Sequence, residues 1–470
     1  MSSQKIPSKA KLAYGAGEMG PAITGNILIF FLPIFFTSVA GLPASLAGII
    51  YMISKAWDAI NDPIIGWLSD RTKSRWGRRI PWMFWGAVPF AAICFSQWLV
   101  PNFSADHQTN QWMLFAYYVI VALLLQAVFT VVTLPYVALT AELTHDYDER
   151  TRLNSFRFAF SLSGSICALL LAHFIFKNIE NEYTQYIVLG GTSSLLSLAL
   201  LAWCIIGVRK LAAQREAERI AAIVSEEKIP FGRQLLIILE NRPFLYVCAI
   251  YLCSWLAVQT TASILPYYVK DWMRLPSDQI PQVILAVQGT ALLMLGFWSW
   301  LSQKVGKKEV YVMGMAFWIV AQIGLLFLEP GQVTLMYVLA VFAGFGVSVA
   351  YLIPWSMMPD VIELDELETG QRREGIFYAF MVLLQKLGLA LGIFLVLQTL
   401  GYAGFIESTP GSPPPVQPEA ALIAIRIAMG PIPGTALIIG LVFAWLYPIT
   451  KEKHAEICRR LQQKKLLRPS

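Results

Sequence analysis

Twelve long apolar stretches, separated by short polar segments, run through this chain of 470 residues. A helix needs about 20 mostly apolar residues to cross the hydrocarbon core of a bilayer, and each stretch reaches that length. Apolar residues make up 56% and charged residues 14% of the chain, whereas soluble domains have about 45–50% and about 25%. The sequence therefore predicts an all-α polytopic membrane protein. The predicted spans are 13–40, 44–69, 80–100, 112–140, 152–176, 185–208, 243–269, 280–302, 309–328, 333–358, 374–402 and 430–449.

Basic residues gather in alternate polar segments. They cluster at 71–79, at 209–242 and in the C-terminal tail, whereas the intervening loops hold only Lys177, Lys270 and Arg274. By the positive-inside rule the basic segments lie in the cytoplasm. We therefore expect a multi-pass protein of the plasma (inner) membrane with both termini cytoplasmic. The net charge of +6 follows from this topology and does not indicate a nucleic-acid partner.

The longest charged segment divides the spans into two halves of six. We predict an N-terminal six-helix bundle at 1–208, a cytoplasmic linker at 209–242, a C-terminal six-helix bundle at 243–449 and a basic cytoplasmic tail at 450–470. One motif follows the second span of each half, as Trp67-Leu68-Ser69 with Gly77-Arg78-Arg79 and as Trp300-Leu301-Ser302 with Gly306-Lys307-Lys308. Two similar halves are typical of transporters that work by alternating access around a midplane site.

Acidic residues interrupt the second span, where Asp58 and Asp62 lie four residues apart and Lys55 precedes Asp58 by three. These three side chains share one helix face. A charge at mid-bilayer costs about 2.5–3.5 kcal/mol even on the mildest insertion scale, so the carboxylates need compensation. A bound Na⁺ with further oxygens from Asn61 and Thr133, a shared proton, or an ion-pair network with Lys55 would each provide it. We expect Na⁺ or H⁺ as a coupling ion and no other cofactor.

Three further ionisable residues lie within predicted spans: Glu18, Arg157 and Lys386. Such residues are candidates for functional sites by default. Lys386 has no acidic neighbour in LLQKLGLALG, and we expect its partner to be Asp58 or Asp62. Glu18 and Arg157 have a simpler alternative, because both could pair locally or reach the membrane interface.

The glycines of the first span match a nucleotide-binding pattern only formally. Gly15, Gly17 and Gly20 fit G-x-G-x-x-G, but no strand precedes them and the segment opens a membrane helix. They therefore predict a small-residue packing face. We expect the same role for Gly388 and Gly392.

The charged loops at the predicted cytoplasmic side are candidate gates. Asp70 can accept hydrogen bonds at a neighbouring helix N-terminus, and acidic residues precede basic ones after the fourth and tenth spans. Such groups can form salt bridges that break on opening, although a merely solvated loop is the alternative. The predicted gate residues are Asp70, Arg71, Arg75, Arg78, Glu142, Arg150, Arg152, Asp360, Arg372 and Arg373.

At these residues the chain resembles the major facilitator superfamily, whose signature G-x-x-x-D-R-x-x-x-R-x-G-R-R matches Gly66 to Arg79. More narrowly, KAWDAINDPIIGWLSDRTKSRWGRRIPW resembles the melibiose-permease-like glycoside–pentoside–hexuronide:cation symporters. The resemblance implies twelve transmembrane helices in two halves and cation binding by Asp58 and Asp62. It also aligns Lys55 and Lys386 with basic residues beside the cation site, and Arg157 with an arginine of the fifth helix.

The substrate site is less similar to that family. The resemblance places Ala22, Thr133 and Val137 where a galactoside carrier has two aspartates and a tryptophan. Two segments, YLIPWSMMPDVIELDE and LPYVALTAELT, are also similar to the sodium-dependent lysophosphatidylcholine symporters of animals. Other glycosides could use different contacts. The predicted substrate-binding residues are Glu18, Ala22, Asn26, Gln126, Thr130 and Arg157.

The predicted function is cation-coupled symport of an organic solute by alternating access. Sugars or glycosides are the first expected substrates and lysophosphatidylcholine-like lipids the second, which the mostly apolar fourth span favours. A membrane sensor or scaffold that does not transport is a third possibility, against which Asp58, Asp62 and Lys386 argue. The four scattered histidines predict no nucleophile–base pair or metal cluster, and hence no enzyme. The expected partners are the coupling cation, the substrate and the lipid bilayer, and we expect a monomer.

Overall fold

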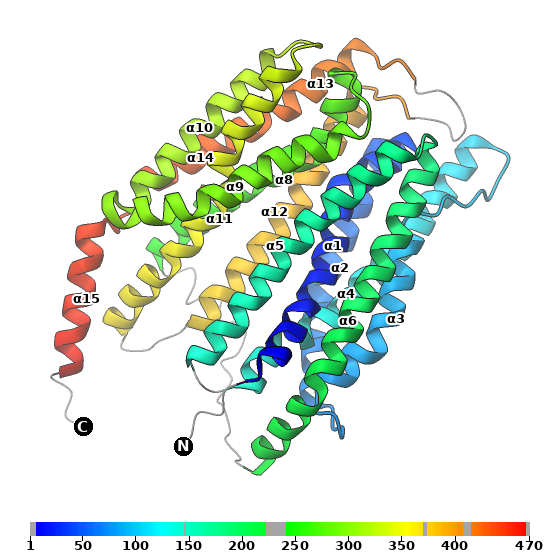
Figure 1. The fold of residues 1–470 in the computed structure, drawn as a ribbon. Coiled ribbons are helices and arrows are strands. Elements are labelled where there is room, and N and C mark those ends of the chain that lie inside the picture. The colour runs from blue at the N-terminus through cyan, green and yellow to red at the C-terminus, as the bar shows by residue number, and fades with distance from the viewer. Residues whose placement is uncertain (1–5, 145–146, 222–240, 370–373, 408–414, 467–470) are drawn as a thin grey trace. The chain divides into compact units, whose positions relative to one another are not determined.

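The computed structural model describes residues 6–144, 147–221, 241–369, 374–407 and 415–466, and every regular element in these ranges is a helix. The prediction of an all-α protein is therefore confirmed. The helices are α1 (Ser8–Ser38), α2 (Ala44–Arg71), α3 (Ile80–Ser96), α4 (His107–Leu143), α5 (Tyr147–Asn178), α6 (Glu182–Ala221), α8 (Arg242–Tyr267), the π-helix η1 (Tyr268–Trp272), α9 (Gln279–Val305), α10 (Lys307–Phe327), α11 (Val333–Thr369), α12 (Glu374–Tyr402), α13 (Glu419–Met429), α14 (Pro431–Leu446) and α15 (Lys451–Leu466) (Figure 1).

Among the described residues, ten helical segments are long and apolar enough to cross a membrane. The helix α3, with 17 residues, is apolar but shorter. The helix α2 has 28 residues, but Lys55, Asp58 and Asp62 lower its mean hydropathy. These two helices occupy the predicted second and third spans, so the pattern of twelve spans is consistent with the helices present.

Two predicted boundaries differ from the helices found. The last span begins earlier than 430, because α13 and α14 form one apolar segment from Glu419 to Leu446 that bends at Gly430. The segment predicted as a linker begins inside α6, which continues to Ala221; residues 222–240 lie outside the described part. Hydropathy detects where a chain turns polar, and a helix continues past that point when its polar residues still favour helix.

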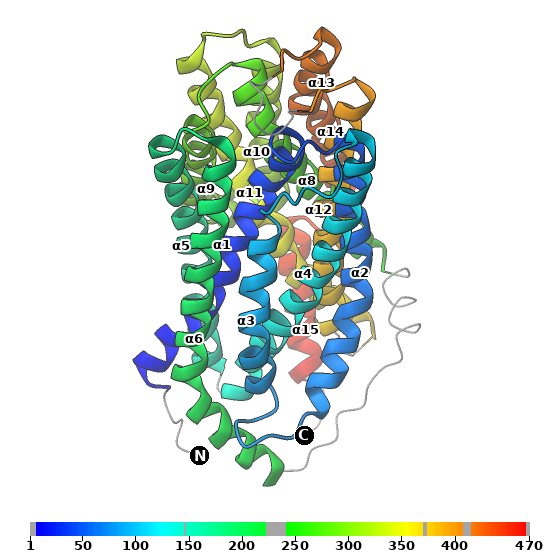
Figure 2. The same ribbon diagram turned by 90° about the vertical axis from the view of Figure 1, so that its right-hand side faces the viewer.

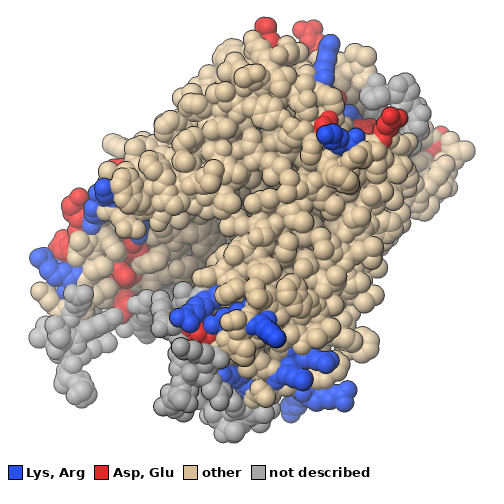
Figure 3. Space-filling view, in the orientation of Figure 1, with Lys and Arg blue, Asp and Glu red and all other residues tan. Residues whose placement is uncertain are grey.

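The chain folds into two compact units, each held together mainly by packing among its own helices. Unit 1 comprises residues 1–226 with 277–281 and 404–417, and unit 2 comprises 227–276, 282–403 and 418–470. On the face shown in Figure 3, the charged side chains gather toward the helix ends and the surface along the helices is largely uncharged. That distribution suits helices whose middles face hydrocarbon.

Within unit 1, α1 packs against both α5 and α6 (Figures 1 and 2). The glycines of α1 make this approach possible: a Cβ on Gly17 would lie 2.6 Å from Cys204 Sγ, and one on Gly20 would lie 3.0 Å from the Ser197 backbone. The predicted packing face is thereby confirmed. Beside these helices, α2 packs on α4 and α3 packs on α4 and α6, which places the polar face of α2 against α4.

Within unit 2, α8 is the helix against which α11, α12 and α14 pack. Here too small residues allow close contact, since a Cβ on Gly388 would lie 2.8 Å from the Trp255 ring and one on Gly392 2.7 Å from Gln259 Cβ. The unit also includes α15, which packs on α11. The segment predicted as a basic tail thus forms a helix that is attached to the bundle.

Candidate functional site

Three oxygen-bearing side chains converge where α2 faces α4. The hydroxyl of Thr130 on α4 donates a hydrogen bond to Asp62 Oδ1 at 2.9 Å, and its oxygen lies 3.4 Å from Asp58 Oδ1. Asp58 is 3% exposed and Thr130 2%, and Asp62 is half-buried. Because Asp58 and Asp62 are one helical turn apart, both reach the same residue of the facing helix. The arrangement provides oxygen ligands from two helices at one point.

Two neighbours border these oxygens. Lys55 Nζ lies 3.8 Å from Asp58 Oδ2, one turn away on the same helix, which is the long end of an ion pair. The Asn61 amide donates to the backbone oxygen of Gln126 at 3.4 Å, so it joins α2 to α4. Lys55 meets one oxygen of Asp58 and Thr130 the other. Pairing with Lys55 and binding of a cation on the Thr130 side are therefore compatible in this geometry.

The two threonines of α4 lie differently from the sequence assignment. Thr130, predicted as a substrate residue, contacts the aspartates. Thr133, predicted beside the cation, instead donates to the backbone oxygen of Phe129 at 2.8 Å, within its own helix. The two positions are three residues apart and share a helix face, so the sequence alone could not tell which one meets α2.

The remaining predicted substrate residues lie on α1, α4 and α5. Arg157 Nε is 3.5 Å from Glu18 Oε2, with the two side chains 20% and 27% exposed. The Asn26 amide nitrogen donates to the Ala22 backbone oxygen at 2.8 Å, and its oxygen accepts from Ser165 at 3.1 Å. Arg157 and Glu18 thus form a partly exposed charge pair, and the Asn26 amide, about two helical turns from Glu18 along α1, is bonded at both its nitrogen and its oxygen.

The signature segment of unit 1 is held by one carboxylate. Glu142 Oε1, near the end of α4, accepts from Arg78 Nε at 2.7 Å and from Arg79 Nε at 2.8 Å. Arg79 is 7% exposed and also donates to Ser69 on α2. Glu142 thereby connects α4 to the segment between α2 and α3. The left-handed backbone of Gly77, with φ of 86°, turns the chain just before these arginines.

The other predicted gate residues of unit 1 have different partners. Arg71 lies over the Trp67 ring at 4.0 Å and Arg75 over the Trp76 ring at 5.3 Å. Arg152 pairs with Glu149 at 3.2 Å. The side chains of Asp70 and Arg150 are outside the described part of the structure. A gating role for all of these residues stays a prediction.

Sequence reasoning missed the contact between Glu149 and the start of α1. Glu149 Oε2 lies 2.8 Å from Lys11 Nζ and accepts from the Ile6 backbone at 3.0 Å. The hydrogen bond from Lys11 lowers the pKa of Glu149 below its ordinary value of 4.5, and the Ile6 bond and the positive charges of Lys11 and Arg152 act in the same direction. These contacts attach the N-terminal end of α1 to α5.

A pH dependence follows from this attachment. A lowered folded-state pKa contributes stability above the unfolded value of 4.5, and this stability is lost as the pH falls through the folded pKa. The variant Glu149→Gln should therefore melt below the parent near neutral pH, and the difference should shrink as the pH falls below 4.5. Thermal unfolding of both proteins across that range tests this. An equal difference at every pH would contradict it.

Unit 2 holds a counterpart of the Glu142 contact. Asp360 on α11 lies 2.6 and 2.8 Å from Lys307 Nζ, which also donates to the Ser356 backbone oxygen at 2.7 Å. Lys307 follows Gly306, whose φ is 113°, as Arg78 follows Gly77. Arg372 and Arg373, the predicted partners of Asp360, lie outside the described residues. Among the described residues, Asp360 therefore has a lysine partner, Lys307, from the motif that follows the second span of each half.

Lys386 lies on α12, in unit 2, whereas Asp58 and Asp62 lie in unit 1. The expected pairing of Lys386 with these aspartates stays a prediction.

Comparison with known proteins extends these observations. Residues 13–451 match the family described as MFS/sugar transport protein. An uncharacterised symporter of Synechocystis is 49% identical, with 98% of each chain covered. The sodium-dependent lysophosphatidylcholine symporter 1 of Gallus gallus is 28% identical over 98% of this chain and 90% of its own. An inner membrane symporter of Escherichia coli is 28% identical over 99% and 97%.

Solved structures agree on the fold. The crystal structure of a nucleoside transporter superposes with a TM-score of 0.65, at 12% sequence identity, over 94% of this chain and 100% of its own. At that identity the likeness concerns the fold alone. The match of the family over nearly the whole chain, the symporter relatives and the helical architecture lead to one conclusion. The chain belongs to the MFS/sugar transport protein family, and so to the major facilitator superfamily of membrane transporters.

Proposed function

We propose that this protein is a Na⁺-coupled symporter that binds its coupling ion at Asp58, Asp62 and Thr130. The observation that carries the proposal is the convergence of both carboxylates on the Thr130 hydroxyl, with Asp58 and Thr130 almost wholly buried. Na⁺, like other hard cations, takes oxygen ligands. A cation between two carboxylates also offsets the cost of keeping their charge inside a membrane helix. The sodium-dependent names of several relatives support the choice of ion.

Coupling follows from linkage between ion and solute. If Na⁺ and solute favour the same state of an alternating-access cycle, each raises the affinity for the other by the same factor. In this proposal Lys386 tunes the aspartates from the other half, and the Glu142 and Asp360 contacts stabilise one state of the cycle. Both termini lie in the cytoplasm, the protein resides in the plasma (inner) membrane as a monomer, and it carries out no enzymatic reaction.

We infer that a zwitterionic lysophospholipid is the preferred substrate. Arg157 and Glu18 form a partly exposed pair of opposite charges. A guanidinium binds phosphate well, and a carboxylate attracts a quaternary ammonium group, so such a pair fits a phosphocholine headgroup. The relatives named as lysophosphatidylcholine symporters support this substrate class.

A glycoside is the second substrate candidate. The family description names sugar transport, and the carboxylate and guanidinium of the same pair could bind sugar hydroxyls. Sugar sites, however, draw on amide groups, and the Asn26 amide is bonded at both ends within unit 1. Ala22 offers no polar side chain at its position. For these reasons we rank the glycoside second, which reverses the order expected from the sequence.

One experiment separates ion, substrate and transport. The purified protein is heated with lysophosphatidylcholine, with a panel of glycosides or with neither, each in Na⁺ and in choline buffer, and uptake is then measured in proteoliposomes. We expect Na⁺ and lysophosphatidylcholine together to raise the Tm more than the sum of their separate effects. Cooperation with a glycoside instead would select the second candidate. Binding without Na⁺-dependent uptake of any substrate would contradict symport and favour a sensor or scaffold.

The two threonines of α4 supply a matched pair for the ion site. Thr130→Ala removes an oxygen that contacts both aspartates, and we expect the Na⁺ affinity to fall about tenfold, a loss typical of one hydrogen-bonding group that faces a charge. Thr130→Ser should retain most of the affinity. Thr133→Ala, whose hydroxyl bonds its own helix, should leave the affinity unchanged. Na⁺ titration of the Tm measures all three variants. Equal effects of Thr130→Ala and Thr133→Ala would place the ion elsewhere.

A further inference from the structure

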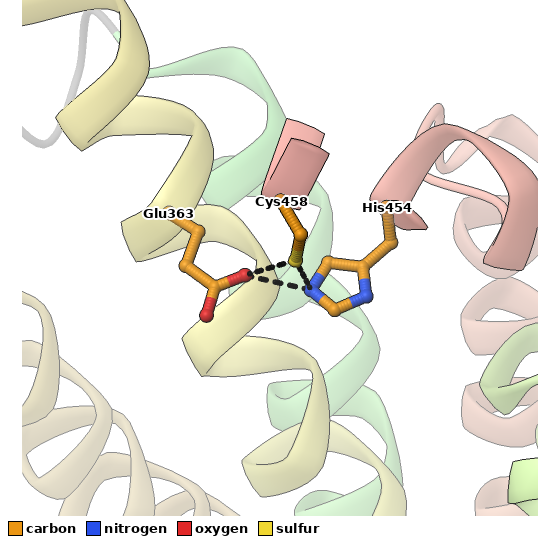
Figure 4. Close-up of side chains that lie close together, drawn as sticks. All are labelled: Glu363, His454 and Cys458. Atoms are coloured by element: carbon orange, nitrogen blue, oxygen red, sulfur yellow. Dashed lines mark hydrogen bonds and ion pairs between the residues drawn. The ribbon is translucent and has the colours of Figure 1, made fainter. Parts of the chain in front are cut away.

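Three side chains with metal-binding atoms meet where α15 packs on α11 (Figure 4). His454 Nε2 lies 2.8 Å from Glu363 Oε2, Cys458 Sγ lies 3.2 Å from the same oxygen, and the sulfur and the ring nitrogen are 3.5 Å apart. The scattered histidines predicted no metal cluster in the sequence. The structure brings His454 together with Cys458, four residues later, and with Glu363 of α11, a grouping that the sequence analysis did not consider.

Local structure explains the convergence. His454 and Cys458 are four residues apart on α15, so they share one helix face. On the same helix Ile457 and Leu461 are 4% and 7% exposed and belong to the hydrophobic core that includes Val361 of α11. Apolar packing thus holds α15 against α11 and fixes the direction in which its two ligand atoms point. Glu363 comes from the α11 side of the same contact.

We propose that Glu363, His454 and Cys458 bind a divalent transition-metal ion, with Zn²⁺ as the ion that fits best. Imidazole, thiolate and carboxylate are the common ligands of Zn²⁺. Ligands about 2.0–2.3 Å from a tetrahedral Zn²⁺ lie about 3.3–3.8 Å from one another, and the three atoms here are 2.8–3.5 Å apart. Small outward shifts would therefore admit the ion, with a fourth position for water.

The surroundings suit an ion that arrives from water. The His454 and Glu363 side chains are 31% and 27% exposed, so the ligands are accessible without unfolding. In the ion-free protein a proton on His454 Nε2 can bond both Glu363 and Asp360, whose Oδ1 is 3.3 Å away. Metal binding uses the lone pair of Nε2 with the ring proton on Nδ1, and the Cys458 thiol releases its proton to solvent as the thiolate binds. The sum is one ion bound and the thiol proton released, without any redox step.

The site would connect two parts of unit 2 beside a charge pair. Asp360 faces His454 and also holds Lys307 at 2.6 Å. A bound ion would therefore add a second link between α15 and α11 to the apolar packing that already holds them together. The proposed metal site is independent of the transported substrate.

Cobalt is the direct probe. The full-length protein, purified without a polyhistidine tag and stripped with EDTA, is titrated with Co²⁺, and bound Co²⁺ is then displaced with Zn²⁺. We expect the parent to bind one ion per chain and to show a thiolate-to-cobalt charge-transfer band. Cys458→Ser should remove this band and bind Zn²⁺ at least tenfold more weakly than the parent. Cys253→Ser, which removes a thiol of α8 outside the cluster, is the control and should retain the band.

A second variant keeps the test sharp should Cys458→Ser fold poorly. Glu363→Gln retains the thiolate, so the band should persist while the Zn²⁺ affinity falls at least tenfold. His454→Gln should have the same effect, and the exposed His107→Gln should have none. Absence of the band in the monodisperse parent, or unchanged Zn²⁺ affinity in both Glu363→Gln and His454→Gln, would overturn the proposal.

Discussion

Asp62→Asn should abolish Na⁺-driven accumulation of substrate while leaving a folded, membrane-inserted protein. The substitution replaces a charged oxygen ligand with a neutral amide but keeps the volume, and the Thr130 hydroxyl can still donate to the amide oxygen in place of the carboxylate at 2.9 Å. The site thus loses a charge without losing its packing. Removal of a charge from a largely buried ion site typically costs several kcal/mol of binding, so Na⁺ should bind at least a hundredfold more weakly.

Asp58→Asn should also abolish Na⁺-driven accumulation, and in addition it should lower the stability of the protein. Asp58 also faces Lys55 at 3.8 Å, so its neutralisation leaves that ammonium with less compensation, and the Tm should fall more than in Asp62→Asn. Proteoliposome uptake under a Na⁺ gradient, together with the Na⁺ dependence of the Tm, measures both variants. Full accumulation by either variant would show that its carboxylate is not a coupling ligand.

Glu142→Gln should destabilise the protein strongly. Glu142 Oε1 accepts from two arginines, and Arg79 is 7% exposed. Removal of their shared carboxylate leaves a buried guanidinium without that counter-charge, which typically costs about 3 kcal/mol or more. A lower Tm and a lower yield of monodisperse protein are expected.

A surface glutamate provides the control for that loss. Glu180→Gln changes an exposed residue between α5 and α6 and should leave the Tm within about a degree of the parent, because exposed substitutions change stability little. Arg78→Gln should have a smaller effect than Glu142→Gln, since Arg79 would keep its carboxylate partner. A Glu142→Gln protein as stable as the Glu180→Gln protein would show that the contact contributes nothing.

The sequence predicted the fold closely because its strongest signal, the length of each apolar stretch, can be read along the chain without knowing which helices pack together. The length of an apolar stretch alone determines where a helix can cross a bilayer. The glycines of α1 predicted a close contact with another helix, and in the structure they pack against Cys204 and Ser197 of α6. The charges of α2 were equally visible, because Asp58 and Asp62 lie in an otherwise apolar stretch. Such features depend on one helix at a time.

What the sequence could not supply depends on two helices at once. Thr130 and Thr133 look alike until α2 is placed against α4. Asp360 pairs with Lys307, 53 residues earlier in the sequence, and its predicted partners Arg372 and Arg373 lie outside the described residues. His454 and Cys458 already had the four-residue spacing of metal ligands, but their third partner lies on α11. The four-residue spacing of a histidine and a cysteine was therefore a usable signal, but the acidic third residue could be identified only once the helix that packs against α15 was known.

The charged contacts made by the basic residues after Gly77 and Gly306 have a consequence for how sequences of this family vary. Each unit closes its own contact, with Glu142 and two arginines in one and Asp360 and Lys307 in the other. The position is repeated, whereas the residue types have diverged. Because the two contacts share no residue, a change of residue type in one need not disturb the other. Across the family, charges at 142 should therefore vary together with those at 78 and 79, and charges at 360 with that at 307, because covariation follows direct contact.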